Sequence, residues 1–123
     1  MVDAIDTLSP KVFLLKKTFE KGYPLVSSMG SGGKFDPTKI EIVDISKSYN
    51  CKFAHAVRKQ LHRLGIRKGF KVVFSPEEVS PEAVRETEGE QNKRSVVGTI
   101  SYMPAAFGIG LASVVIRDLM KDD

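Results

Sequence analysis

The sequence is poor in the residues that build covalent cross-links and zinc sites. Its 123 residues include one cysteine and two histidines, which excludes an internal disulfide framework and a multi-cysteine zinc site. The histidines, His55 and His62, are not part of an HExxH pair, so a zinc hydrolase is not indicated. We therefore expect a protein of a reducing compartment, the cytoplasm.

Segments that would direct the chain to a membrane are also missing. The first six residues carry two acids, Asp3 and Asp6, where a secretory signal needs a basic start. The longest apolar run, residues 105–116, is shorter than the roughly 20 residues that cross a bilayer. These features predict a soluble protein with no membrane partner.

What the sequence does contain is an ordinary globular balance of 41% hydrophobic and 28% charged residues. The net charge of +4 is compatible with a polyanionic partner but does not demonstrate one. We expect a single partial domain over residues 1–123, with an α/β core at 1–76, a mobile crossover loop at 77–98 and a C-terminal strand and helix at 99–121.

The first part of the core alternates strands with a helix. The patterns predict strands over 2–6 and 25–29, and a helix between them with Ser9 as its N-cap and Pro10 as its first residue. Val12, Leu15 and Phe19 then face the core at helical spacing, and the lysines, Lys11 included, point away from it.

Further strands are predicted over 40–45 and 70–74. Asn50 is expected to cap a second helix that buries Ala54, Val57, Leu61 and Leu64 and stops at Gly65. The last helix, over 104–121, carries Gly108 and Ala112 one turn apart and is expected to be buried on most sides. The fold class is α/β, a mixed sheet with helices, and it resembles the second half of a larger fold because the first strand has no flanking chain.

Two segments are candidates for binding phosphate or metal. Gly30, Gly32, Gly33 and Lys34 follow a strand, where glycine amides can form a concave anion site, although their spacing fits neither a Walker loop nor a GxGxxG fingerprint. Asp6 ends the first strand and can hold Mg²⁺ beside a nucleotide phosphate. A plain connector and a helix-preceding turn remain the alternatives for these two segments.

Residues 46–75 contain no acid but eight lysines and arginines. Among them we single out Arg58, Lys59, Arg63, Arg67 and Lys68, which lie off the apolar stripe of the second helix or just beyond it. Such a surface suits phosphates, and a solvated helix face is the alternative. Cys51, at the start of this helix, is either an activated thiol or a small buried residue, and the histidines are expected to be solvated.

An ordered set of segments resembles one family, the tRNA threonylcarbamoyladenosine dehydratases of the ThiF/MoeB/HesA superfamily, related to ubiquitin-activating enzymes. The segments are residues 3–6 (DAID), 9–11 (SPK), 24–28 (PLVSS), 30–33 (GSGG), 36–38 (DPT), 44–47 (DISK), 72–77 (VVFSPE) and 98–104 (GTISYMP). The resemblance implies the C-terminal half of a Rossmann-like ThiF-type fold, because the family's glycine-rich ATP loop precedes the aspartate segment. The nucleotide-binding half is then missing.

The resemblance also implies an activity. Such enzymes use ATP and Mg²⁺ to activate the threonylcarbamoyl carboxylate on a tRNA adenosine and then cyclise it with loss of water. Asp6 matches the acidic residue near the phosphates and metal, and the Gly30–Lys34 loop matches the substrate end of the site. We expect tRNA as partner, and no tight ATP binding by this chain alone.

Three alternatives remain open at this point. The chain is part of the tRNA dehydratase, or part of an enzyme that adenylates a ubiquitin-like or sulfur-carrier protein, or a non-catalytic module for dimerisation and substrate docking. An unpaired sheet edge and the Gly108/Ala112 patch favour a homodimer or higher oligomer.

Overall fold

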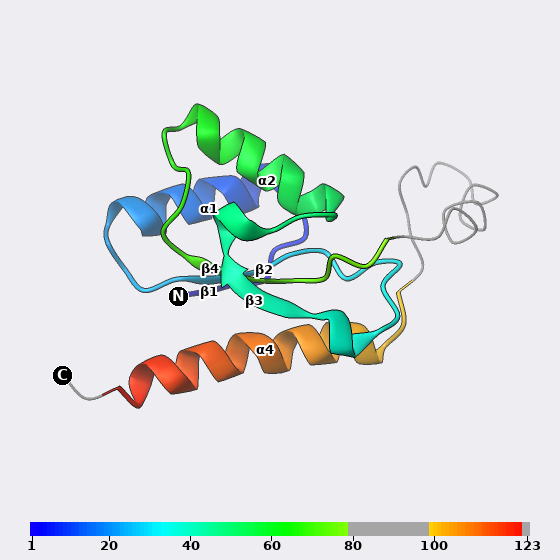
Figure 1. The fold of residues 1–123 in the computed structure, drawn as a ribbon. Helices are drawn as coiled ribbons and strands as arrows, with labels where there is room; N and C mark the ends of the chain where they lie inside the picture. The colour runs from blue at the N-terminus through cyan, green and yellow to red at the C-terminus, as the bar shows by residue number, and fades with distance from the viewer. Residues whose placement is uncertain (79–98, 122–123) are drawn as a thin grey trace.

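In the part of the chain that the structure describes, three α-helices cover the two faces of a four-stranded sheet (Figure 1). The computed structural model describes residues 1–78 and 99–121. Within them lie β1 (Val2–Asp3), α1 (Leu8–Glu20), β2 (Val26–Ser28), η1 (Pro37–Lys39), β3 (Glu41–Asp44), η2 (Ile45–Lys47), α2 (Lys52–Arg63), β4 (Lys71–Phe74) and α4 (Tyr102–Leu119).

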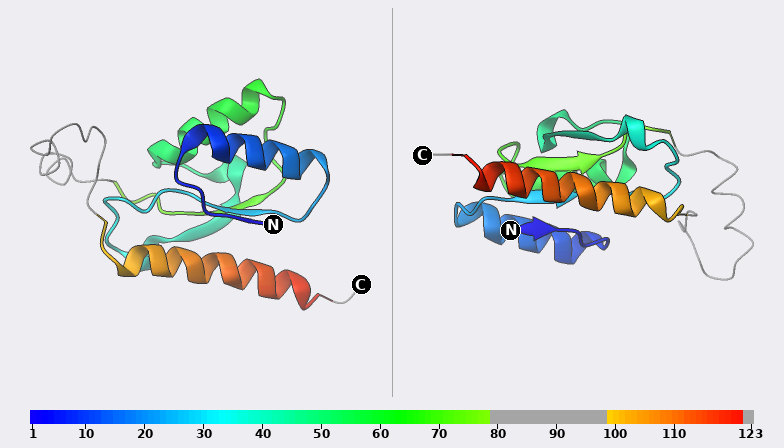
Figure 2. Two further views of the ribbon diagram at one scale, coloured as in Figure 1. Left: turned by 180° about the vertical axis from the view of Figure 1, so that it is seen from behind. Right: turned by 90° about the horizontal axis from the view of Figure 1, so that it is seen from below.

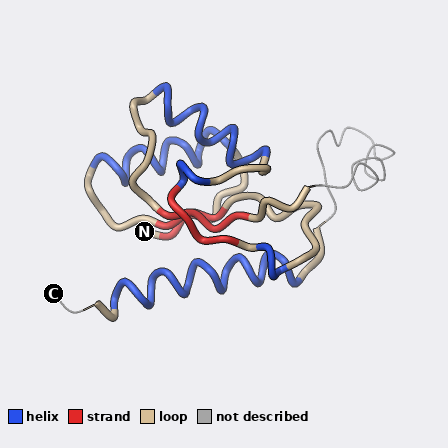
Figure 3. The backbone as a smooth tube through the Cα atoms, viewed as in Figure 1, coloured by secondary structure: helices blue, strands red, loops and turns tan. Residues whose placement is uncertain are grey.

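The sheet has the strand order β1-β2-β4-β3. Its strands are drawn in red between the helices in Figure 3. β1, β2 and β4 run parallel, with Val26 opposite Lys71 and Ser27 opposite Val72, whereas β3 is antiparallel to β4. The predicted mixed α/β sheet is thus confirmed. Because the parallel strands end at the same edge, the loops after β1 and β2 meet there.

Helices α1 and α2 pack on one face of the sheet and α4 on the other (Figure 2). Each face of the sheet has its own hydrophobic core. Adjacent residues of β4 belong to different cores, because successive side chains of a strand point to opposite faces. Val72 joins the cluster of Leu15, Ala54, Val57 and Leu61 under α1 and α2. Val73 joins the cluster of Val26, Met103, Phe107, Leu111 and Val114 under α4.

Both predicted helix caps were wrong by one or two residues. α1 is capped by Thr7, not Ser9, and Pro10 still fits because the amides of a first helical turn have no partner within the helix. α2 is capped by Cys51, whose Sγ accepts from the Ala54 amide at 3.4 Å. Asn50 instead takes a positive φ of 51°, a conformation that asparagine tolerates better than most residues.

The last helix is far less buried than we predicted. Only Met103, Phe107, Leu111 and Val114 are buried, one residue per turn, while Ile109 is 72% and Leu119 80% exposed. One sheet face can cover only one stripe of a helix, and nothing in the described chain covers the other side. Leu64, also predicted to be buried, is 44% exposed because it lies past the last turn of α2.

Gly110 is the glycine that lets α4 lie close to the sheet. A Cβ on Gly110 would lie 3.1 Å from Cγ1 of Val73, whereas one on Gly108 would meet nothing within 4 Å. α4 is also long and apolar enough to cross a membrane by length and composition alone, contrary to the expectation from the shorter run 105–116. In the structure it lies along the sheet.

The remaining expectation concerns the segment after β4. Residues 79–98 of the expected crossover loop lie outside the described residues. Residues 99–101 are described and form no strand, so the expected C-terminal strand is absent from that stretch.

Candidate functional site

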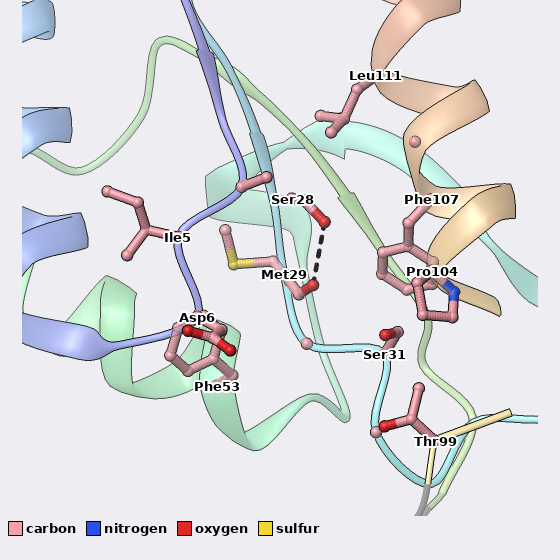
Figure 4. A pocket seen from close by; sticks show the side chains of 14 residues that line it. Ile5, Asp6, Ser28, Met29, Ser31, Phe53, Thr99, Pro104, Phe107 and Leu111 are labelled. Carbon is pink, nitrogen blue, oxygen red and sulfur yellow. Dashed lines mark hydrogen bonds between the residues drawn. The ribbon is translucent and has the colours of Figure 1, made fainter. Parts of the chain in front are cut away.

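A pocket of about 500 Å³ opens where β1 and β2 end, beside the first turns of α4 (Figure 4). Its lining comes from the end of β1, the loop after β2, α2 and α4: Ala4, Ile5, Asp6, Ser28, Met29, Gly30, Ser31, Gly32, Phe53, Thr99, Pro104, Phe107, Gly108 and Leu111. Ligands of open α/β sheets bind at this edge, beyond the carboxyl ends of the parallel strands. The volume suits a small organic ligand.

Two of the segments selected from the sequence meet in this pocket. Asp6, which is exposed, and Gly30 and Gly32 all line it, although about 24 residues of chain separate them. β1 and β2 pair in parallel, so their ends emerge side by side. The pocket therefore places one carboxylate opposite a stretch of glycine backbone.

The other two residues of the predicted loop lie elsewhere. Gly33 is buried with φ 74° and, like Lys34, is not part of the pocket lining. The Lys34 side chain turns inward, where its ammonium donates to the carbonyls of Glu77 and Asn50. Burial lowers the pKa of Lys34. Lys34 thus stabilises the loop from below and its charge is not presented to a ligand in the pocket.

The loop after β2 is held from outside by residues on either side of segment 79–98. One carboxylate oxygen of Glu77 accepts from the amides of Phe35 at 2.8 Å and Asp36 at 2.9 Å. The hydroxyl of Tyr102, the first residue of α4, donates to the Phe35 carbonyl at 2.7 Å. The described residues on both sides of segment 79–98 therefore contact the same loop, and no residue pattern predicts this contact.

Beneath the pocket lies a buried ion pair that contradicts a prediction. Lys11, expected to point away from the core, is fully buried, and its ammonium lies 2.6 Å from the Asp3 carboxylate. Asp3 also accepts from the Ser27 hydroxyl at 2.6 Å. Burial lowers the pKa of Lys11, against the opposing effects of the hydrogen bond and charge of Asp3.

Apolar side chains form much of the pocket wall. Met29 and Phe53 border it from one side, and Phe107 and Leu111 from α4 (Figure 4). Our sequence reading missed Phe53 and the α4 residues as site residues. Their helical spacing indicates only that they pack in a core. α2 and α4 are far apart in the sequence, and only the fold brings them to one pocket.

The predicted basic residues form an exposed surface along and beyond α2. Lys59, Arg63, Arg67 and Lys68 are exposed. Arg58 is half-buried, and its guanidinium donates to the Ser48 hydroxyl. Within residues 1–78 and 99–121, no salt bridge engages these five cations.

The remaining candidates give no reactive constellation. Cys51 is buried and serves as a cap, whereas His55 and His62 are exposed, as expected for solvated residues. Across the described part of the chain, no group of three or more His, Cys, Asp or Glu side chains is placed to hold a metal ion.

Comparisons with known proteins point to one group. The chain is 36% identical over 129 residues to the tRNA threonylcarbamoyladenosine dehydratase of Bacillus subtilis, covering 99% of this chain and 51% of the relative. It is 29% identical to tRNA threonylcarbamoyladenosine dehydratase 2 of Saccharomyces cerevisiae, covering 97% of this chain and 30% of that protein. No protein-family model matches the chain.

Solved structures agree with these relatives. The Escherichia coli tRNA N6-threonylcarbamoyladenosine dehydratase, TcdA, in complex with ATP superposes with a TM-score of 0.80 at 29% identity, covering 97% of this chain and 46% of that chain. The same enzyme in complex with AMP gives a TM-score of 0.80 at 28% identity. The chain spans about half the length of the bacterial relatives it matches.

Proposed function

We propose that this chain, a homologue of the C-terminal half of the tRNA threonylcarbamoyladenosine dehydratases, supplies the substrate side of an ATP-dependent site that cyclises threonylcarbamoyladenosine in tRNA. The overall reaction activates the threonylcarbamoyl carboxylate with ATP and closes a ring with loss of water. The observation that carries this proposal is the convergence of Asp6 and the Gly30–Gly32 backbone on one pocket.

The two sides of the pocket suit different parts of the substrate. Backbone amides of a glycine-rich turn can bind a carboxylate or phosphate oxygen. The apolar wall around Phe53 and Phe107 suits a nucleobase taken out of its stack. We therefore assign the substrate nucleoside to this pocket, with its carboxylate toward Gly30 and Gly32.

Asp6 fits a role beside Mg²⁺ and ATP. Mg²⁺ is usually held by one or two carboxylates together with substrate phosphates and waters, so a single exposed carboxylate at a pocket suffices on the protein side. When bound, the ion would neutralise charge on the phosphates. Asp6 would hold and orient it at the edge of the pocket.

The exposed basic surface supports tRNA docking. Lys59, Arg63, Arg67 and Lys68 carry like charges with no acid between residues 46 and 75. Phosphate contacts of this kind provide affinity that does not depend on nucleotide sequence. With tRNA as substrate, we propose the cytoplasm as the protein's location.

The exposed side of α4 supports a homodimer. Tyr102, Ala105, Ile109, Ala112, Ile116 and Leu119 recur at alternating intervals of three and four residues, the spacing of a coiled-coil seam. We call these six residues the α4 seam. Large residues at one set of positions (Tyr102, Ile109 and Ile116) and the small Ala105 and Ala112 at the other, which ends in Leu119, would let a second α4 approach closely.

A chimera tests the proposed activity. Residues 1–123 replace the matching half of the Bacillus subtilis relative, and the chimera is assayed with ATP, Mg²⁺ and tRNA that carries threonylcarbamoyladenosine. We expect loss of one water from the nucleoside, detected by mass spectrometry. Asp6→Asn in the chimera should lower turnover at least about tenfold, because the carboxylate charge beside Mg²⁺ and phosphate is lost. A folded, ATP-binding chimera that leaves the nucleoside unchanged would contradict the proposal.

A further inference from the structure

The ammonium of Lys11 joins the two strand ends that form the pocket. It donates to the Ile5 carbonyl at 2.8 Å and to the Ser28 carbonyl at 2.7 Å, in addition to its 2.6 Å contact with Asp3. Ile5 and Ser28 both line the pocket, and they directly precede Asp6 and Met29. An ammonium has three N–H donors, so these three oxygens use its whole capacity.

Asp3 completes the arrangement from below. Its two oxygens accept from the Ile5 amide at 3.0 Å and the Ser27 hydroxyl at 2.6 Å. Asp3 and Lys11 therefore both contact the ends of β1 and β2. In the described chain, no buried side-chain polar atom near this pair lacks a hydrogen-bond partner.

Stability alone does not account for such a pair. Replacing a buried ion pair with apolar residues is often neutral or stabilising, because removing two charges from water offsets their attraction. α1 offers a contrast in the pair Lys16–Glu20, which is partly exposed and contacts only its own helix. What distinguishes Lys11 is that its partners are the backbone of the pocket.

We propose that Lys11, with Asp3, is a positioning residue that fixes the Asp6 side of the pocket relative to the Gly30–Gly32 side. It acts through the carbonyls of Ile5 and Ser28. Its ammonium also lies 5.4 Å from the centroid of the Phe53 ring, so the same charge contributes to holding the aromatic wall.

The test removes the charges together. In Asp3→Asn/Lys11→Met, asparagine keeps an acceptor for the Ile5 amide and methionine keeps the bulk of the lysine stem. We expect a cooperative fold in which the NMR order parameters of Asp6 and Gly30–Gly32 fall by at least about 0.2, while those of Val72 and Val73 stay near 0.85. The matched control, Lys16→Met/Glu20→Gln on the same helix, should leave all of them unchanged.

Ser27→Ala provides a milder variant if the double variant does not fold. It removes one hydrogen bond to Asp3, so the same amides should loosen by a smaller amount. Unchanged order parameters around the pocket in a folded variant would overturn the proposal.

The activity measurement rests on the proposed function, whereas the NMR measurement does not. In the chimera, Asp3→Asn/Lys11→Met should lower kcat at least about tenfold with a smaller change in KM, because misplacing reacting groups mainly affects the chemical step. An inactive parent chimera would contradict the proposed function but leave the NMR result as the test of positioning. Parent-like kcat in a variant with loosened pocket amides would overturn the positioning role.

Discussion

The carboxylate of Asp44 accepts a hydrogen bond from the amide of Gly69 at 2.9 Å, across 25 residues of sequence. The same carboxylate accepts from the Ser46 amide and hydroxyl at 2.9 and 2.8 Å. Partial burial acts to raise the pKa of Asp44, but these hydrogen bonds outweigh it and lower the pKa from its usual value. One carboxylate thus joins the end of β3 to the turn that precedes β4.

This arrangement predicts a pH dependence of stability. Because the folded pKa of Asp44 is depressed, its contribution is present above the unfolded value of about 3.9 and is lost as pH falls through the folded pKa. Asp44→Asn should lower the free energy of unfolding at pH 7 and reduce its fall between about pH 5 and pH 2. Urea unfolding over that pH range measures both effects.

Asp36 is the matched control for Asp44. It accepts from the Thr38 amide and hydroxyl at 2.9 and 2.6 Å in the same local geometry, but no long-range amide bond to its side chain occurs in the described structure. Asp36→Asn should therefore cost less than Asp44→Asn. Equal costs would mean that the bond to Gly69 contributes nothing measurable.

Two glycines of α4 predict different outcomes for the same substitution to alanine. Gly108→Ala should raise the free energy of unfolding by about 0.5–1 kcal/mol, since alanine is the better helix former and its Cβ meets nothing. Gly110→Ala gains the same helix propensity but places its Cβ 3.1 Å from Val73. Overpacking of this kind lowers the free energy of unfolding by about 1–3 kcal/mol. Thermal unfolding should rank Gly108→Ala above the parent and Gly110→Ala below Gly108→Ala; the reverse order would contradict this account of the packing.

The basic surface predicts a change in salt dependence. Replacing Lys59, Arg63 and Arg67 by Ala should weaken tRNA binding and reduce the slope of log Kd against log salt by about 2. Arg58 is left unchanged because its guanidinium donates a hydrogen bond to the Ser48 hydroxyl.

The control for this experiment removes three charges elsewhere. Lys17, Lys21 and Lys39 are exposed lysines off α2, and their replacement by Ala changes the net charge by the same amount. Filter binding over a salt series compares the two triple variants. If both lose affinity equally, the binding reflects net charge and the surface on α2 has no special role.

The α4 seam predicts a defined effect on oligomeric state. Ile109→Lys, placed at its centre, should shift a dimer toward monomer in light scattering, because a buried unpaired charge is costly. Phe13 is also exposed, at 63%, but lies on α1, and Phe13→Lys should leave the oligomeric state unchanged. A parent that is monomeric at high micromolar concentration would contradict the dimer itself.

Much of the local structure could be read from residue patterns. The stripe of Val12 and Leu15 and that of Ala54, Val57 and Leu61 are buried as predicted, because a period of 3.6 residues marks one side of a helix wherever the helix lies. Gly22 and Gly65 follow the predicted helix ends with positive φ, a conformation that glycine adopts without steric cost.

Polar residues were the main source of error. Lys11 and Lys34 are buried, although a lysine in an isolated pattern is expected at the surface. Burial of an ammonium becomes tolerable only where enough oxygens surround it, and those oxygens come from Asp3, Ile5 and Ser28 in one case and from Asn50 and Glu77 in the other.

The sequence by itself determined the three helices α1, α2 and α4, the strands β1 to β4, the mixed α/β class of the sheet and the resemblance that singled out Asp6 and Gly30. Only the tertiary structure decided which cations are buried, which glycine of α4 meets the sheet and which aromatic rings border the pocket. The physical reason is the separation along the chain over which each effect acts. Periodicity and propensity act over a few residues, whereas the burial of a charge and the shape of a cavity depend on atoms that the fold brings from distant parts of the chain.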